Sequence, residues 1–214
     1  MKITKFGHCC LLIEENGVKI LTDPGTYSRG FENIKNIDLI LITHEHTDHL
    51  HIDSLKTLIA NTGEKGLLII TNKGVGKQLE VAGIPYYEIL EDGKHLDFKG
   101  ILIEAIGHDH APLYKTSPCI NTGFFIANRL FYPGDSLHNP HKKVELLALP
   151  VAGPWLKLPE AIDYALELKP KIAFPVHEGM YAKQPGSVHR LPPTILEPQG
   201  IKFLILEDGK EYEF

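Results

Sequence analysis

The strongest constraint on this chain is a six-residue segment at positions 44–49, with the sequence HEHTDH, in which four side chains are potential metal ligands. The residues before it, 38–43, form a short, almost wholly apolar run rich in Ile, which indicates a buried strand. Asp53 is a suitable N-cap for a helix over 54–60. The segment is therefore predicted on the turn that leaves the carboxyl end of a strand, where open α/β sheets place ligand sites.

The spacing of the four potential ligands favours two metal ions over one. His44 and His46 are two residues apart, so in extended backbone they point the same way. Asp48 and His49 follow after the chain has turned and can face a second point nearby. One ion cannot easily take all four from so short a loop, but two adjacent ions can share them. A bare polar turn would need Gly, Pro or Asn rather than three imidazoles, so we interpret the segment as a metal site.

Length, charge and cysteine content set the class of protein. The chain has 214 residues, 43% of them hydrophobic, which is enough for one domain over residues 1–214. Its net charge of −5, with basic residues scattered, leaves no footprint for nucleic acid. The N-terminus lacks the apolar core of a signal peptide, and no apolar run approaches the ~20 residues of a membrane span. We expect a cytoplasmic enzyme that acts on a small molecule, without a nucleic-acid or membrane partner.

The three cysteines, Cys9, Cys10 and Cys119, are an odd number, which argues against a disulfide framework. Adjacent cysteines on a strand point to opposite faces, so we expect buried, reduced thiols. The alternative is that Cys9 and Cys10 bind metal.

Several further elements can be placed by their patterns. Asn16-Gly17 predicts a hairpin between strands at 10–14 and 18–22, and Asp92-Gly93 predicts another at 89–94. Asn72 can cap a helix that ends at Gly83. The remaining predicted elements are strands at 67–71, 101–106, 123–127, 130–132, 144–151 and 171–176, and a helix at 160–168 opened by Pro159.

Two stretches are harder to interpret. The stretch 200–210 resembles 83–94, which fits a fold made of two similar halves. Residues 178–193, which include Lys183, are rich in Gly and Pro and are predicted as a long loop that either covers the site or lies free at the surface.

The pattern His-x-His-x-Asp-His after a buried strand resembles the signature of the metallo-β-lactamase-fold hydrolases. This resemblance implies a four-layer αβ/βα sandwich, in which two mixed sheets face each other and helices cover the outer faces. It also implies seven ligands in two groups joined by a bridging carboxylate: His44, His46 and His110; Asp48, His49 and His177; and Asp135, which follows Gly134, between them.

Two histidines compete for the third position of the first group. The spacing from His110-Ala111 to Asn121 is similar to that of a subgroup in which the histidine before Ala is the ligand. We therefore expect His110 to bind metal and His108 to be a neighbour or substrate contact. Side chains two residues apart can face the same way, so the reverse assignment stays open at this point.

Three other residues have both a structural and a functional interpretation. Asp23, before a Pro-Gly turn, has turn chemistry, but the resemblance implies that it supports the metal loop by hydrogen bonds. His8 follows Gly7 at a strand, where the resemblance likewise places a histidine near the site. Trp155, on a Gly-Pro loop, either lines a pocket or packs in the core.

The ligand types indicate the chemistry. Imidazole and carboxylate without thiolate suit two divalent ions, Zn(II) first, with Mn(II) or Fe(II) as alternatives. Two such ions about 3.5–4 Å apart can be bridged by a hydroxide. Water bound to a metal ion has a pKa of about 7, so this hydroxide can form at neutral pH. Asp48 and His110 are expected to contribute directly to catalysis, with Asp48 orienting the hydroxide. The expected reaction is hydrolysis of an ester, lactone, amide or phosphoester. As a compact chain that begins with a Gly-His strand and has no long insertion, the protein resembles the lactonase-like branch of the superfamily.

Two other functions are compatible with the same motif. One is a phosphodiesterase or tRNA-processing nuclease of this fold, against which the lack of a basic arm counts. The other, from a different class, is a di-iron redox protein, whose members usually have Glu where this chain has His46.

Overall fold

The computed structural model describes residues 1–62, 67–181 and 186–214. Two seven-stranded mixed sheets form its centre. The first sheet contains, in spatial order, β14 (Glu211–Glu213), β1 (Lys2–Lys5), β2 (Leu11–Glu15), β3 (Val18–Thr22), β4 (Leu39–Leu41), β5 (Leu68–Thr71) and β6 (Tyr87–Ile89). The second contains β13 (Lys202–Phe203), β12 (Ile172–Val176), β11 (Leu146–Pro150), β10 (Leu130–Tyr132), β9 (Gly123–Ile126), β8 (Ile101–Ile106) and β7 (His95–Phe98).

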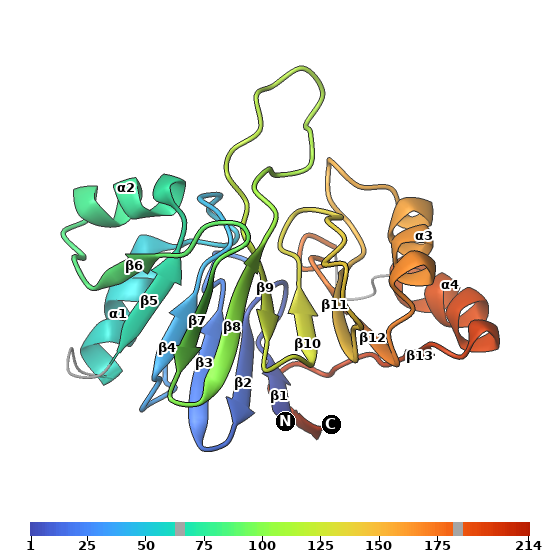
Figure 1. Ribbon diagram of the computed structural model, residues 1–214, viewed down its shortest axis with the longest axis horizontal. Helices are drawn as coiled ribbons and strands as arrows, with labels where there is room; N and C mark the ends of the chain where they lie inside the picture. Colours follow the sequence, from blue (N-terminus) through green and yellow to red (C-terminus); the bar gives the residue numbers. More distant parts are fainter. Residues whose placement is uncertain (63–66, 182–185) are drawn as a thin grey trace.

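Helices cover the outer face of each sheet, so the predicted four layers are confirmed (Figure 1). α1 (Ile52–Thr62) and α2 (Lys73–Val81) pack on the first sheet through Leu55, Leu58, Val75 and Leu79. α3 (Leu158–Leu168) and α4 (Ser187–Leu196), followed by the 3-10 turn Glu197–Gln199, pack on the second sheet. The helices bury one apolar stripe each and leave the other side to solvent, as amphipathic surface helices do.

The largest apolar cluster lies between the two sheets. β8 alternates buried and half-buried residues, and its buried set, Ile101, Ile103 and Ala105, belongs to this cluster. Phe124 and Phe174 from the same sheet pack there with strand residues of the first sheet. Burying one such side chain contributes about 1.5–3 kcal/mol, so this cluster is a main source of the fold's stability.

Strand direction explains where the site lies. β1, β3 and β4 of the first sheet run the same way, because β2 pairs antiparallel with β1 and β3, and β3 pairs parallel with β4. By the same reasoning β8, β10 and β12 of the second sheet share one direction. The loops that follow the strands of each set therefore leave from one edge of their sheet, and each of the predicted ligands lies on one of these loops.

The predicted hairpin at Asp92-Gly93 is wrong. β6 belongs to the first sheet and β7 to the second, so the turn carries the chain across from one sheet to the other. β7 instead pairs with β8, through the turn at Lys99 and Gly100. An Asp-Gly pair supplies the positive φ of a tight turn, 74° at Gly93, but does not determine whether the flanking strands pair. The similar stretch at 200–210 also crosses between sheets, from β13 to β14, as expected of two like halves.

Two other predictions are corrected at helix boundaries. α1 begins at Ile52, so Asp53 lies in its first turn, where a carboxylate still favours the positive end of the helix dipole, rather than at the N-cap. The loop predicted over 178–193 ends early, because α4 begins at Ser187 and includes Pro192 and Pro193. Packing of Val188 and Leu196 against the second sheet outweighs the loss of two N–H donors. Lys183 lies outside the described residues.

The Asn72 cap and the Asn16-Gly17 hairpin are confirmed. Asn72 Oδ1 accepts hydrogen bonds from the N–H groups of Gly74 and Val75. β2 and β3 pair antiparallel around Asn16 and Gly17, both at positive φ. None of the helices in the described part of the chain is long and apolar enough to cross a membrane.

Candidate metal centre

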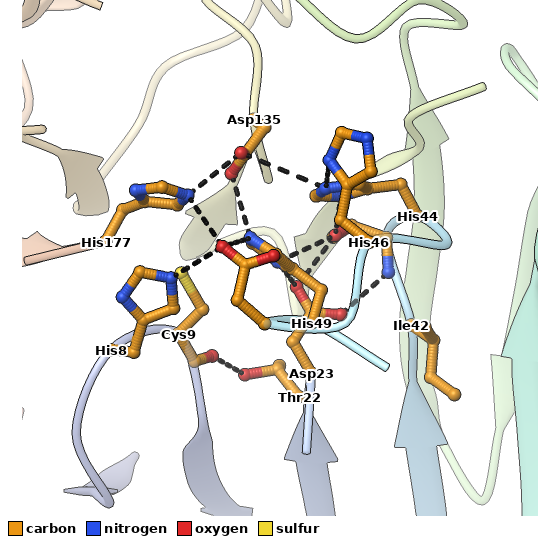
Figure 2. Close-up of polar contacts among 12 residues, drawn as sticks. His8, Cys9, Thr22, Asp23, Ile42, His44, His46, His49, Asp135 and His177 are labelled. Carbon is orange, nitrogen blue, oxygen red and sulfur yellow. Dashed lines mark hydrogen bonds and ion pairs between the residues drawn. The ribbon is translucent and has the colours of Figure 1, made fainter. Parts of the chain in front are cut away.

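Six loops at one edge of the sandwich bring the predicted site residues together (Figure 2). The HEHTDH segment follows β4, and the other residues follow five further strands: His8 and Cys9 after β1, Asp23 after β3, His110 after β8, Asp135 after β10 and His177 after β12. This convergence follows directly from the shared direction of these strands.

The first group of nitrogen atoms comes from His44, His46 and His110. The Nε2 atom of His44 lies 3.1 Å from Nδ1 of His46. The rings of His46 and His110 have their centroids 4.7 Å apart. Burial, followed by the nearby His49, lowers the pKa of His44 well below its usual value, so this ring is neutral and has a lone pair to offer.

Asp135 lies between this group and a second one. Its Oδ2 is 3.3 Å from Nε2 of His110 and 3.9 Å from Nε2 of His44. On the other side the same oxygen is 2.9 Å from Nε2 of His177, and Oδ1 is 3.1 Å from Nε2 of His49. One carboxylate therefore faces nitrogen atoms of both groups, as a bridging ligand must.

The second group consists of His49, His177 and Asp48. Oδ2 of Asp48 lies 3.6 Å from Nε2 of His177 and 3.9 Å from Nε2 of His49. The two histidines are buried, while Asp48 keeps about 20% of its side chain exposed. Asp48 is thus the ligand candidate of this group that substrate or solvent can reach.

Unsatisfied buried atoms test whether these residues fit metal ions. Five side-chain atoms of the centre are buried without a hydrogen-bond partner of good geometry: Nε2 of His49, Nε2 of His110, Oδ1 of Asp135, and both ring nitrogens of His177. Buried polar atoms nearly always have hydrogen-bond partners, so several unpaired atoms in one centre need an explanation. Divalent cations supply it, because the carboxylate oxygen and one nitrogen of each neutral imidazole have the lone pairs that cations such as Zn(II) bind. The residues fit the ions.

The opposite nitrogens of three rings are already engaged, which fixes the proton on the far side. Nδ1 of His49 is 2.7 Å from Oδ2 of Asp23, and Nδ1 of His110 is 2.5 Å from the carbonyl oxygen of Ala111. Nδ1 of His44 is 3.0 Å from Oγ1 of Thr43, whose own hydroxyl donates to Asp23. Such contacts hold Nδ1–H and direct the Nε2 lone pair inward, an arrangement typical of metal-binding histidines.

Asp23, predicted to support the loop, is completely buried behind it. Its Oδ1 accepts from the backbone N–H of Thr43 at 2.8 Å. Besides His49 and the Thr43 hydroxyl, its Oδ2 accepts from the hydroxyl of Tyr132 at 2.6 Å. It therefore ties the segment after β4 to both sheets.

His8 is also engaged through both ring nitrogens. Its Nδ1 accepts from the N–H of Gly179 at 3.0 Å, so Nε2 carries the proton and donates to Oδ2 of Asp48 at 3.2 Å. His8 orients Asp48 from behind.

The structure separates the two competing histidines after β8. His110 is 3% exposed and lies in the centre, whereas the side chain of His108 is 61% exposed and contacts Asp109. The connection from β8 to β9 that carries both projects beyond the sheets (Figure 1). His108 thus lies outside the cluster.

The strained backbone positions of the centre support a functional role. His8, Asp23 and His177 have φ values of 39°, 35° and 66°, in the left-handed region that non-glycine residues rarely adopt. Each costs on the order of 1–3 kcal/mol and persists only where neighbours enforce it, a pattern concentrated at functional sites.

Sequence reasoning missed contributions that depend on tertiary contacts. The indole N–H of Trp155 donates to Oδ2 of Asp135 at 2.8 Å, which settles its role beside the centre. Asn121 accepts from the backbone N–H of Asp135 and donates to the carbonyl of Pro133. Tyr132 was predicted only as a strand residue. An isolated Trp on a Gly-Pro loop was the only available signal among these.

A cavity of about 330 Å³ opens beside the first group. Its lining consists of Glu45, His46, His110, Ala111, Leu113, Thr116, Ser117, Pro118 and Cys119. Most of these residues belong to the projecting connection between β8 and β9. This connection therefore forms the wall of the cavity next to the candidate metal ligands.

Sequence comparisons agree with this geometry. Residues 2–177 match a family model described as "Beta-lactamase superfamily domain". Protein Rv0786c of Mycobacterium tuberculosis is 35% identical over 195 residues, 88% of this chain and 89% of its own. A protein of Aeropyrum pernix named UPF0173 metal-dependent hydrolase is 26% identical over 242 residues, with 100% and 97% of the two chains covered.

Solved structures share the fold. Igni18, a metallo hydrolase of Ignicoccus hospitalis, superposes with a TM-score of 0.76 over 100% of this chain and 98% of its own, at 21% identity. CmlA, a diiron β-hydroxylase of Streptomyces venezuelae, has a TM-score of 0.79 at 18% identity and matches over 54% of its own length. At these identities the two structures show the fold alone. The family match and the 35% identical relative show that this chain belongs to the β-lactamase superfamily.

Proposed function

We propose that this protein uses two divalent metal ions to hydrolyse an uncharged ester or lactone of a small molecule. The superfamily and the relatives named metal-dependent hydrolases identify the chain as a metal-dependent hydrolase. The number of ions and the substrate class are the parts that we add.

The observation that supports two ions is the position of Asp135 between two groups of nitrogen atoms. Its carboxylate oxygens lie 2.9–3.9 Å from ring nitrogens of four histidines. His44, His46 and His110 would hold one ion, and His49, His177 and Asp48 the other. Bound there, two ions would polarise the oxygen of the scissile bond and lower the pKa of water. Zn(II) suits these ligands best, with Mn(II) or Fe(II) as alternatives.

The chain's own groups prepare this site for hydrolysis. Burial would raise the pKa of Asp48, but the hydrogen bond from His8 and the charge of His49 hold it far below its usual value. Asp48 therefore stays ionised, and serves as a ligand and an acceptor of hydrogen bonds rather than as an acid. Trp155 holds the bridging carboxylate in one orientation through its N–H.

The neighbouring cavity supports an uncharged substrate. Its volume of about 330 Å³ is at the lower end for small-molecule pockets, which start at about 300 Å³. Its described lining contains the carboxylate of Glu45 but no Lys or Arg. Apart from the ions themselves, a phosphoester would meet the like charge of Glu45 with no Lys or Arg in the described lining to bind its outer oxygens, so an ester or lactone is favoured.

The test combines metal analysis with a substrate panel. Protein purified without chelators and reconstituted with Zn(II) or Mn(II) is expected to hold close to two ions per chain by elemental analysis. It is expected to hydrolyse at least one uncharged lactone or nitrophenyl ester faster than phosphodiesters. A metal content near zero would overturn the proposal. An Fe–O–Fe absorption band without hydrolysis of any panel member would favour the redox class.

A further inference from the structure

The thiol of Cys9 lies inside the second group, although the proposed function does not use it. Its residue is 1% exposed, and its Sγ lies within 4.8 Å of ligand atoms of His8, His49 and His177. Figure 2 shows the sulfur directed toward the cluster.

Hydrogen bonding shows which members of this four-residue cluster are free to bind a metal ion and that His8 is not one of them. Both ring nitrogens of His8 are engaged, by Gly179 and Asp48, so His8 has no lone pair left for a metal ion. Nε2 of His49 and both nitrogens of His177 have no hydrogen-bond partner of good geometry and are at least nine-tenths buried. The atoms left to share an ion are therefore Nε2 of His49, a nitrogen of His177 and Sγ of Cys9.

The backbone holds Cys9 in this position. Its carbonyl oxygen accepts a hydrogen bond from the Thr22 hydroxyl at 2.8 Å and lies 3.0 Å from the hydroxyl oxygen of Tyr132. Gly7 and His8 before it have φ values of 79° and 39°, which turn the chain sharply after β1. The sulfur is therefore placed near the histidines by groups other than the ion itself.

The neighbouring cysteine provides the contrast. Cys10 belongs to the apolar cluster between the first sheet and its helices, whereas Cys9 borders the cluster between the two sheets. Cys9 is the member of the pair that faces the metal centre.

We infer that Cys9 is a thiolate ligand of the second metal ion, together with His49 and His177. This inference rests on the proposed pair of metal sites. It adds sulfur to a site that otherwise has only imidazole and carboxylate ligands, and thiolates select Zn(II) over Mn(II). The two sites of one molecule would then differ in preference, because the described ligands of the first, His44, His46, His110 and Asp135, offer only nitrogen and oxygen.

The test measures sulfur coordination directly. X-ray absorption of the zinc-loaded protein is expected to show a sulfur neighbour at about 2.3 Å on one of the two ions. Because the chain has 3 cysteines, the double variant Cys10→Ser/Cys119→Ser leaves Cys9 as the sole thiol and is expected to keep that signal. This variant identifies Cys9 without changing it, so the test does not depend on how well a Cys9 variant folds.

Substitution of Cys9 itself is the second part of the test. Cys9→Ser and Cys9→Ala are expected to lose the sulfur signal and to bind the second Zn(II) at least about tenfold more weakly, while Mn(II) affinity changes less. Loss of the signal in Cys119→Ser instead would assign the sulfur to Cys119, which lies 3.8 Å from Nε2 of His46, and would overturn the inference.

Two further outcomes separate this inference from the proposed function. Two bound ions with no sulfur neighbour in the unmodified protein would overturn the inference and leave the proposed function intact. Fewer than two ions after reconstitution would overturn the pair of sites on which both rest.

Discussion

Oδ2 of Asp23 lies 2.7 Å from Nδ1 of His49, and both side chains are completely buried. The carboxylate follows β3 and the imidazole follows β4, so the pair joins two adjacent parallel strands at the edge that carries the centre. In the neutral ring the contact keeps the proton on Nδ1, so the lone pair lies on Nε2, 3.1 Å from Oδ1 of Asp135, where a metal ion can bind it. The orientation of His49, a candidate metal ligand, therefore depends on a carboxylate from the neighbouring strand.

Asp23→Asn should therefore weaken metal binding selectively. The amide nitrogen of Asn cannot accept from His49, Thr43 and Tyr132 as the carboxylate does, so His49 loses its orientation. We expect about 10-fold to 100-fold weaker binding of one of the two ions by chelator competition, with the other little changed. Asp109→Asn, at an exposed carboxylate that contacts His108, is the control and should bind both ions normally. Equal weakening in both variants would contradict this role for Asp23.

The histidines after β8 offer a direct comparison. His110→Ala should lower the metal content toward one ion per chain and abolish most activity, because the first group loses one of three imidazoles. His108→Ala should retain both ions, since its side chain is 61% exposed outside the cluster. Elemental analysis of the two variants decides the assignment. Metal loss in His108→Ala with full retention in His110→Ala would reverse it.

Much of this centre was accessible from the sequence, for a physical reason. Residue type and position after a buried strand sufficed to nominate the segment 44–49, and the resemblance to the metallo-β-lactamase-fold hydrolases supplied His110, Asp135 and His177. The fold class was implied by the same resemblance and is confirmed.

What the sequence could not supply was pairing between distant segments. Asp92-Gly93 defines a turn but not the sheet that receives the next strand. Trp155 and Cys9 gain their place near the centre through contacts with residues on other loops, which their own positions in the sequence do not specify. The helix α4 was not predicted, because Pro192 and Pro193 lower the local preference for helix and its stability comes from packing.

Trp155→Phe tests the orientation of the bridging carboxylate. The variant keeps an aromatic ring of similar shape but removes the N–H that donates to Oδ2 of Asp135 at 2.8 Å. We expect kcat to fall about 10-fold or more with a smaller change in KM, as is typical when a partner of a metal ligand is lost. Tyr164→Phe is the control, because it removes a buried donor, to the carbonyl of His138, that does not contact the centre. Unchanged kcat in Trp155→Phe would show that the hydrogen bond has no catalytic effect.

Metal binding should release a proton from His49. In the metal-free protein burial acts to lower the pKa of His49, but the charges of Asp135, Cys9 and Asp23 outweigh it and hold the pKa well above 6.5. The folded pKa is raised, so the charged ring stabilises the metal-free fold fully below pH ~6.5, and this contribution is lost as pH rises through the raised pKa. Metal affinity follows the opposite trend and rises over that interval, because a metal ion needs the neutral ring.

Calorimetry in buffers of different ionisation enthalpy measures this proton. At pH ~7 we expect net proton release when the second group binds its ion. His44 provides the internal comparison, since its pKa is held well below the usual value, by burial first, and the ring has no extra proton to lose. Binding without net proton release would show that the ring is neutral before the ion arrives.

The last prediction concerns Gly134, the glycine before Asp135. Gly134 has a φ of 65°, and a Cβ there would lie 2.4 Å from Oδ1 of Asn121 and 2.8 Å from Cβ of Thr43. Both neighbours are buried and hold the centre, so neither can move without displacing Asp135 or the segment after β4. Gly17→Ala is the matched control, because Gly17 also has a positive φ, 81°, but nothing lies within 4 Å of its added Cβ. Its cost should be the backbone term alone, about 1–2 kcal/mol in the free energy of unfolding.

Gly134→Ala carries the same backbone cost and, in addition, about 1–3 kcal/mol for overpacking. Urea unfolding of both variants in the presence of a chelator isolates this difference from any change in metal binding. After reconstitution Gly134→Ala should also hold less metal than Gly17→Ala, since the carboxylate that joins the two groups has moved. Equal stability of the two variants would mean that the contact at Asn121 relaxes freely, and that close packing behind Asp135 does not fix its position.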